Sequence, residues 1–76
     1  MERKLLNRIR VVLAEKDMSN KHLAELLGKD PAVVSKWVTN TNQPSLETLI
    51  AIANALEVPV QELVRQDKIQ SGEIIK

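Results

Sequence analysis

The spacing of hydrophobic residues along the chain predicts a series of short amphipathic helices. Apolar side chains recur every three or four residues over 3–16, which predicts a first helix with one buried face. That face consists of Leu5, Leu6, Ile9, Val12 and Leu13. A second helix is predicted to begin after Ser19, a residue type that caps helices, and to end at Gly28. Its buried stripe consists of Leu23, Ala24 and Leu27.

The break between the second and third predicted helices is the most informative feature of the sequence. Gly28 adopts a left-handed conformation at little cost, and Asp30 followed by Pro31 is a strong start signal for a helix. Two helices so closely joined must cross steeply, and the small Ala24 allows them to approach. The buried stripe of the third helix consists of Val34, Trp37 and Val38. Its opposite face remains free to enter a groove of DNA.

Two further helices are predicted after a turn at residues 40–44. Ser45 caps the fourth helix, and Glu47 lies in its first turn, where a negative charge suits the helix dipole. The predicted buried face consists of Leu46, Leu49, Ile50, Ala53 and Leu56. A fifth helix is expected over 60–66, with Val58 packing against Leu63.

The pattern therefore predicts an all-α fold, a compact five-helix bundle that forms one domain over residues 1–66. Residues 67–76 form a tail, which is either flexible or docks on a partner in a dimer through Ile69, Ile74 and Ile75. The composition agrees, because a chain of 76 residues with a single aromatic residue must build its core from aliphatic side chains.

Composition also limits the chemistry. The chain has no cysteine and one histidine, His22, so a metal or redox cofactor is not expected and none is assigned. A small bundle without a Gly-rich loop offers little room for a catalytic pocket, so we expect that the protein is not an enzyme. The first residues are charged and run directly into a helical pattern, so we expect no signal peptide, no membrane span and a cytoplasmic location.

Charge is distributed unevenly, although the net charge is only +1. Residues 1–40 hold eight Lys or Arg against five acidic residues, whereas residues 41–66 hold one Arg against three Glu. The basic part of the chain is the part that carries the predicted helix-turn-helix, which favours a polyanionic partner.

Several segments together resemble the Cro/C1-type helix-turn-helix domains, known as the XRE family, over about residues 5–66. The matching segments read LNRIR, SNKHLAELLG, VVSKW and QPSLETLIAIANALEV. The matching residues are Leu23, Ala24, Gly28, Val34 and Trp37 in the helix-turn-helix and Pro44, Ser45 and Leu46 at the start of the fourth helix. The structural core of the motif consists of Leu23, Ala24, Leu27, Gly28, Val34 and Trp37. The resemblance implies a five-helix fold of the lambda-repressor type and a transcriptional regulator that binds double-stranded DNA. It further implies a homodimer on a palindromic operator, with no small-molecule ligand evident.

The resemblance also implies which residues contact DNA. The base-contacting positions correspond to Pro31, Ala32, Val33, Ser35 and Lys36, with Thr39 as a neighbour. Methyl groups pack on thymine and Lys36 suits guanine or a phosphate, so a preference for A·T base pairs is expected. Phosphate contacts are expected from Asn20, Lys21, Asn40, Thr41 and Asn42.

Some positions depart from the family pattern. Asn20 replaces a usual glutamine, and Lys29 replaces a usual buried aliphatic residue. Val38 and Asn40 stand where glutamate and glycine are common, so the following loop is expected to have its own shape.

The sequence also allows a second function. The protein could be an adaptor or antitoxin that binds another protein and for which DNA binding is secondary. Exposed Val60 and Val64 suit either a protein partner or a dimer seam.

Overall fold

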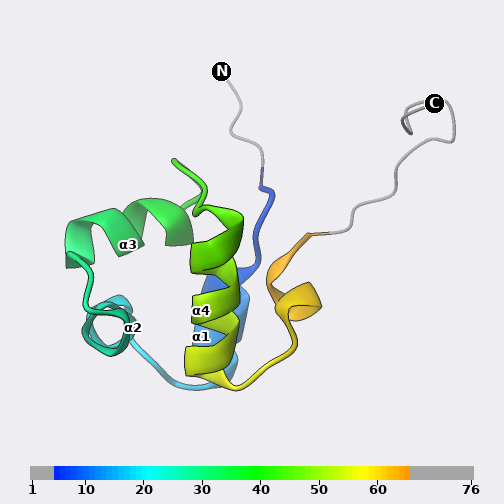
Figure 1. Ribbon diagram of the computed structural model, residues 1–76, viewed down its shortest axis with the longest axis horizontal. Helices are drawn as coiled ribbons and strands as arrows, with labels where there is room; N and C mark the ends of the chain where they lie inside the picture. Colours follow the sequence, from blue (N-terminus) through cyan, green and yellow to red (C-terminus); the bar gives the residue numbers. More distant parts are fainter. Residues whose placement is uncertain (1–4, 66–76) are drawn as a thin grey trace, which may run out of the picture.

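The computed structural model describes residues 5–65, which form four α-helices and one 3-10 helix (Figure 1). In chain order the elements are α1 (Ile9–Glu15), α2 (Asn20–Leu27), α3 (Pro31–Val38), α4 (Leu46–Leu56) and η1 (Val60–Leu63). Within residues 5–65, β-type pairing is limited to an isolated antiparallel bridge between Asn7 and Val64. The predicted all-α class is confirmed, with a 3-10 turn in place of the fifth α-helix.

Three predicted caps mark the starts of α2, α3 and α4. The hydroxyl of Ser19 accepts the backbone N–H of His22 at 3.0 Å. The carboxylate of Asp30 accepts the N–H of Ala32 at 2.9 Å, and Pro31 takes the first helical position. Ser45 caps α4 in the same way. These local bonds satisfy amides that no helical carbonyl reaches, so each helix begins where the sequence predicts.

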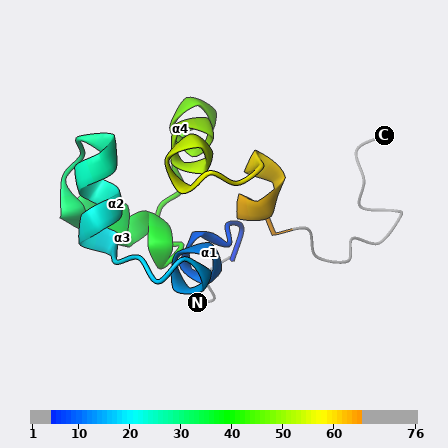
Figure 2. The same cartoon turned by 90° about the horizontal axis from the view of Figure 1, so that it is seen from below.

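Gly28 ends α2 with a φ of 67°, in the left-handed region predicted for it. The two residues that follow then carry the chain directly into α3. In Figure 1 α2 is seen end-on while α3 runs across the view, so the two helices cross steeply. Figures 1 and 2 both place α2 and α3 at one end of the described domain and η1 at the other, with α1 and α4 between them.

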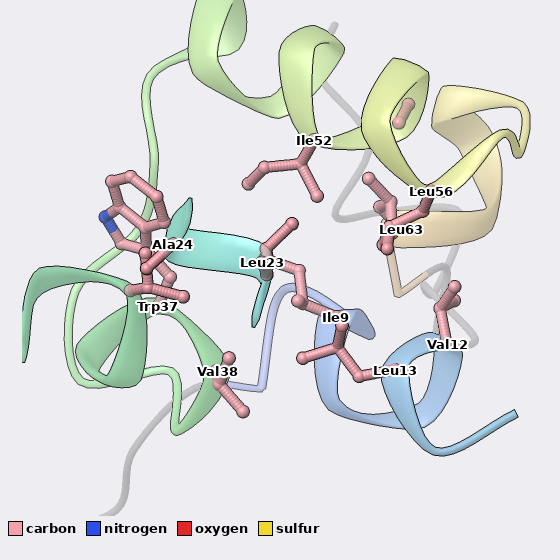
Figure 3. Packing of buried hydrophobic residues seen from close by; sticks show 12 residues of the cluster. Ile9, Val12, Leu13, Leu23, Ala24, Trp37, Val38, Ile52, Leu56 and Leu63 are labelled. Atoms are coloured by element: carbon pink, nitrogen blue, oxygen red, sulfur yellow. The ribbon is translucent and has the colours of Figure 1, made fainter. Parts of the chain in front are cut away.

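One hydrophobic core joins all five elements (Figure 3). Leu23 of α2 lies near its centre, between Ile9 of α1 and Ile52 of α4, and all three side chains are fully buried. Trp37 is 8% exposed and belongs to this core, as its spacing with Val34 predicts. The other members are Val12, Leu13, Ala24, Val34, Val38, Ala53, Leu56 and Leu63.

The first helix begins later than predicted. It starts at Ile9, and Leu5 and Leu6 are each half exposed in an extended segment. The cause is tertiary, because the N–H of Arg8 donates to the carbonyl of Leu63 and the N–H of Arg65 donates to that of Leu6, both at 2.8 Å. Hydrogen bonds to a distant segment replace those that a longer helix would make.

The predicted fifth helix is also shorter and different in type. Only Val60–Leu63 are helical, with 3-10 geometry, and Val64 is extended where it pairs with Asn7. Leu63 is fully buried and Val58 packs against the core, as predicted. Residue 66 and the tail lie outside the described residues.

The buried face of α4 is rotated from the predicted one. Leu46 is 72% exposed and Ile50 is 45% exposed, whereas Ile52 is fully buried. Leu49 is partly buried, and Ala53 and Leu56 are buried as predicted. Because α4 is apolar almost all round, its sequence fits more than one stripe, and packing against α2 and η1 selects the one observed.

Candidate nucleic-acid interface

The third helix exposes one face and buries the other. Pro31, Ala32, Val33 and Lys36 are exposed, and Ser35 is half-buried. The opposite residues Val34, Trp37 and Val38 are buried in the core. The face predicted to contact bases is therefore a convex apolar surface with a single cationic side chain, Lys36. A helix presented in this way fits the width of a DNA major groove.

A shallow hollow lies beside α3, where α1 and the start of α2 meet its last turn. Three polar side chains line it, those of Arg10, Asn20 and Thr39, over a floor formed by Leu13, Ala14, Met18 and Val38. Asn20 is the first residue of α2, and Lys21 next to it is exposed. Two of the predicted phosphate contacts thus lie next to the free amides at a helix N-terminus, where anions bind readily.

Arg10 is a residue that the sequence-based site omitted. It lies on α1, ten positions before Asn20, which is the first predicted DNA contact in the chain. Its side chain is exposed at the edge of the hollow. From the sequence, Arg10 is recognised only as one of the basic residues of positions 1–40. Packing of α1 against α3 brings its guanidinium to the same surface, where it adds a cation suited to a phosphate.

The loop after α3 folds back onto the helix end. The backbone N–H groups of Thr41 and Asn42 both donate to the carbonyl of Lys36, at 2.9 and 3.2 Å. The hydroxyls of Thr39 and Thr41 are 2.8 Å apart and hydrogen-bonded. Thr41 and Asn42 are exposed, and these backbone hydrogen bonds hold them at the C-terminal end of α3.

Asn40 has a different place from its predicted partners in the loop. Its side chain is 8% exposed and accepts hydrogen bonds from the backbone N–H groups of Leu6 and Asn7. Its own N–H donates to the carbonyl of Trp37. Because these groups are used within the protein, we remove Asn40 from the set of phosphate contacts and assign it a structural role.

Two other departures from the family pattern are explained by position. Lys29 is exposed, and a shallow hollow lies beside it, lined by Leu27, Glu47, Thr48 and Ala51. Lys29 is thus exposed to solvent at the place of the usual buried aliphatic residue. Val38, in the usual place of a glutamate, is buried against the core. His22 is exposed on α2, and residues 5–65 hold no cluster of three or more metal-ligating side chains.

Within residues 5–65, Arg8 and Glu62 form an ion pair at 3.6 Å, between the segment before α1 and η1. Glu47 lies in the first turn of α4, Glu57 directly follows α4, and Glu62 lies in η1. The candidate interface carries the exposed cations Arg10, Lys21 and Lys36, together with the exposed carboxylate of Asp30 that caps α3.

Comparison with known proteins agrees with this geometry. The model of the family described as Helix-turn-helix (HTH_3) matches residues 9–63, and the family consists of DNA-binding domains rather than enzymes. The chain belongs to this family of Cro/C1-type helix-turn-helix domains. Its sequence is 47% identical to that of a protein whose crystal structure is described as a putative DNA-binding protein from Bacteroides fragilis. The two structures superpose with a TM-score of 0.77. That match covers 79% of this chain and 97% of the other.

No curated protein matches the chain. None of the helices within residues 5–65 is long and apolar enough to cross a membrane.

Proposed function

We propose that the protein is a transcriptional regulator that binds duplex DNA sequence-selectively, as a homodimer on a palindromic operator where it acts as a repressor. The observation that carries the proposal is the two-sided α3, which is anchored in the core by Val34 and Trp37 and exposes Ala32, Val33 and Lys36. The family match and the name of the Bacteroides fragilis relative support DNA as the partner.

Base readout is assigned to the outer face of α3. The methyl groups of Ala32 and Val33 would pack on thymine methyls, while Lys36 would donate to guanine or to a phosphate. Pro31 and Ser35 lie on either side of these residues. Such a surface has few hydrogen-bond donors, so we expect a preference for A·T base pairs and a contribution from DNA shape.

Phosphate contacts are assigned to two places next to α3, the start of α2 and the loop that follows α3. Asn20, Lys21 and the first amides of α2 would bind one stretch of the backbone, together with Arg10. Thr41 and Asn42 would bind the other. The distance between the two places is set by the core rather than by a flexible linker, because α2 and α3 are packed against each other.

The homodimer follows from the small footprint of one α3. A single recognition helix covers a few base pairs, whereas two related by a two-fold axis read half-sites about 34 Å apart, one turn of DNA. The candidate dimer interface is the end of the described domain opposite α3, where Val60 and Val64 are 37% and 43% exposed. Exposed apolar residues of this kind are typical of a contact between subunits.

The proposal is tested by selecting bound fragments from random duplexes at two salt concentrations. We expect an enriched A·T-rich palindrome whose half-site centres are about ten base pairs apart. Enrichment that persists at the higher salt separates sequence readout from general attraction to phosphates. Weak, unselective binding that moderate salt abolishes would contradict the regulator and favour the adaptor or antitoxin role.

Replacing Lys36 with alanine is expected to weaken binding and to reduce its salt dependence. Removing one cation that contacts a phosphate should lower the slope of log binding constant against log salt by about one unit. Lys29→Ala is the matched control, because Lys29 is also exposed but lies beside α4 rather than on the outer face of α3. Fluorescence anisotropy with the selected duplex measures both, and an unchanged slope in Lys36→Ala would assign that lysine to solvent.

A further inference from the structure

Three side-chain amides form a closed hydrogen-bonded cluster between the loop that follows α3 and the segment before α1. Asn7 Nδ2 donates to Gln43 Oε1 at 2.8 Å, and Gln43 Nε2 donates to Asn40 Oδ1 at 3.0 Å. The circle closes through the backbone of Asn7, whose N–H donates to Asn40 Oδ1 at 3.0 Å and whose carbonyl accepts from Asn40 Nδ2 at 3.2 Å. We call this cluster the amide lock.

The amide lock joins segments that are far apart in the sequence. Asn7 Nδ2 also donates to the carbonyl of Trp37 at 2.9 Å, in the last turn of α3. Asn7 Oδ1 accepts the N–H of Ile9 at 3.1 Å, in the first turn of α1. One side chain therefore satisfies backbone groups at the start of α1 and at the end of α3, which ties the two helices to the loop.

Two of the three members of the lock are buried, and its buried polar atoms all have hydrogen-bond partners. Asn7 and Asn40 are 7% and 8% exposed, and they are the buried polar residues of the described chain. Within residues 5–65 every buried side-chain nitrogen or oxygen has a hydrogen-bond partner. A buried network that is fully satisfied favours one arrangement of its members, because any other leaves polar groups unpaired.

The backbone of Asn40 explains only part of this arrangement. Its φ is 61°, a left-handed conformation that asparagine tolerates and that glycine adopts at lower cost. Glycine would turn the chain equally well but would have no amide to bind Asn7 and Gln43. The side chain of Asn40 thus adds a connection that the turn itself does not need.

We propose that Asn7, Asn40 and Gln43 are positioning residues for DNA binding, which hold Thr41 and Asn42 ready to contact a phosphate. The inference rests on the proposed function. Thr41 and Asn42 are exposed and make no contribution to the core, so their place is fixed by the bonds to Lys36 and by Asn40 and Gln43, the lock members that flank them in the chain. A loop held in its bound geometry before DNA arrives loses less conformational entropy on binding.

The lock carries no charge, which gives it a distinct signature. Breaking it should lower the affinity for the selected duplex about tenfold, the cost of ordering one or two side chains on binding. The slope of binding against salt and the preferred sequence should stay unchanged, because no cation and no base contact is lost. Lys36→Ala, by contrast, changes the slope.

The experiment compares Asn7→Ala, Asn40→Gly and Gln43→Ala in the full chain. Asn40→Gly keeps the left-handed turn and removes the amide, and Gln43→Ala removes an exposed member that the core does not need. Val12→Ala is the control, since Val12 is buried in α1 and lies outside the lock. Each variant is used below its unfolding temperature, with the folded fraction measured by circular dichroism.

Two measurements decide the inference. In the free protein, heteronuclear NOE values of the Thr41 and Asn42 amides should fall in the lock variants and stay at wild-type values in Val12→Ala. Affinity for the selected duplex should fall about tenfold in folded Asn40→Gly and Gln43→Ala but not in Val12→Ala. Unchanged NOE values, or affinities within twofold of wild type in the folded variants, would overturn it. Failure of the wild-type protein to bind any duplex would instead overturn the proposed function, and the NOE values would still report on the lock.

Discussion

Trp37→Ala is expected to lower the free energy of unfolding by roughly 3–5 kcal/mol, most of what a domain of this size possesses. The indole is 8% exposed and belongs to the core that joins α2, α3 and α4, so its removal leaves a cavity in addition to the lost burial. Because Trp37 is the single tryptophan of the chain, urea denaturation must be followed by circular dichroism at 222 nm rather than by fluorescence.

Two controls define the result. Trp37→Phe keeps much of the aromatic volume and should lose clearly less stability than Trp37→Ala. Leu46→Ala removes a large apolar side chain that is 72% exposed, and its unfolding midpoint should hardly change. A loss below about 1 kcal/mol in Trp37→Ala would contradict a core role, since full burial of a large side chain implies more.

Val33→Glu is expected to abolish specific DNA binding, with a loss of affinity of more than about 100-fold. Val33 is 43% exposed on the outer face of α3, next to Lys36 and away from the buried Val34. A carboxylate placed there would lie in the groove between two rows of phosphates, and like charges brought together in an interface cost several kcal/mol. Anisotropy titration with the selected duplex measures the loss.

The matched control is Ile50→Glu, which introduces the same charge at a site of similar exposure, 45%, on α4. Both variants should unfold within a few degrees of the wild-type protein, because exposed positions tolerate a charge. Equal affinities for Val33→Glu and the wild-type protein would show that the outer face of α3 does not meet DNA. Equal losses in both variants would point to a general charge effect instead.

The candidate site was predictable where it depends on a single helix. The alternation of Val34 and Trp37 with Val33 and Lys36 follows from the helical period, so the outer face of α3 could be identified residue by residue. Arg10 could not, because its place beside Asn20 depends on how α1 packs against α2 and α3. Nor could the burial of Asn40, which requires Asn7, 33 positions earlier, as its partner.

Local sequence is sufficient to predict the caps at Ser19, Asp30 and Ser45, the turn at Gly28 and the core position of Trp37. These features depend on residues within a few positions of one another, whose hydrogen bonds and helical period act locally. Three other features depend on contacts between distant segments: the start of α1, the buried face of α4, and the 3-10 turn after Pro59 with its bridge to Asn7. In each of these cases the local pattern allowed more than one arrangement, and hydrogen bonds and packing between distant segments selected one.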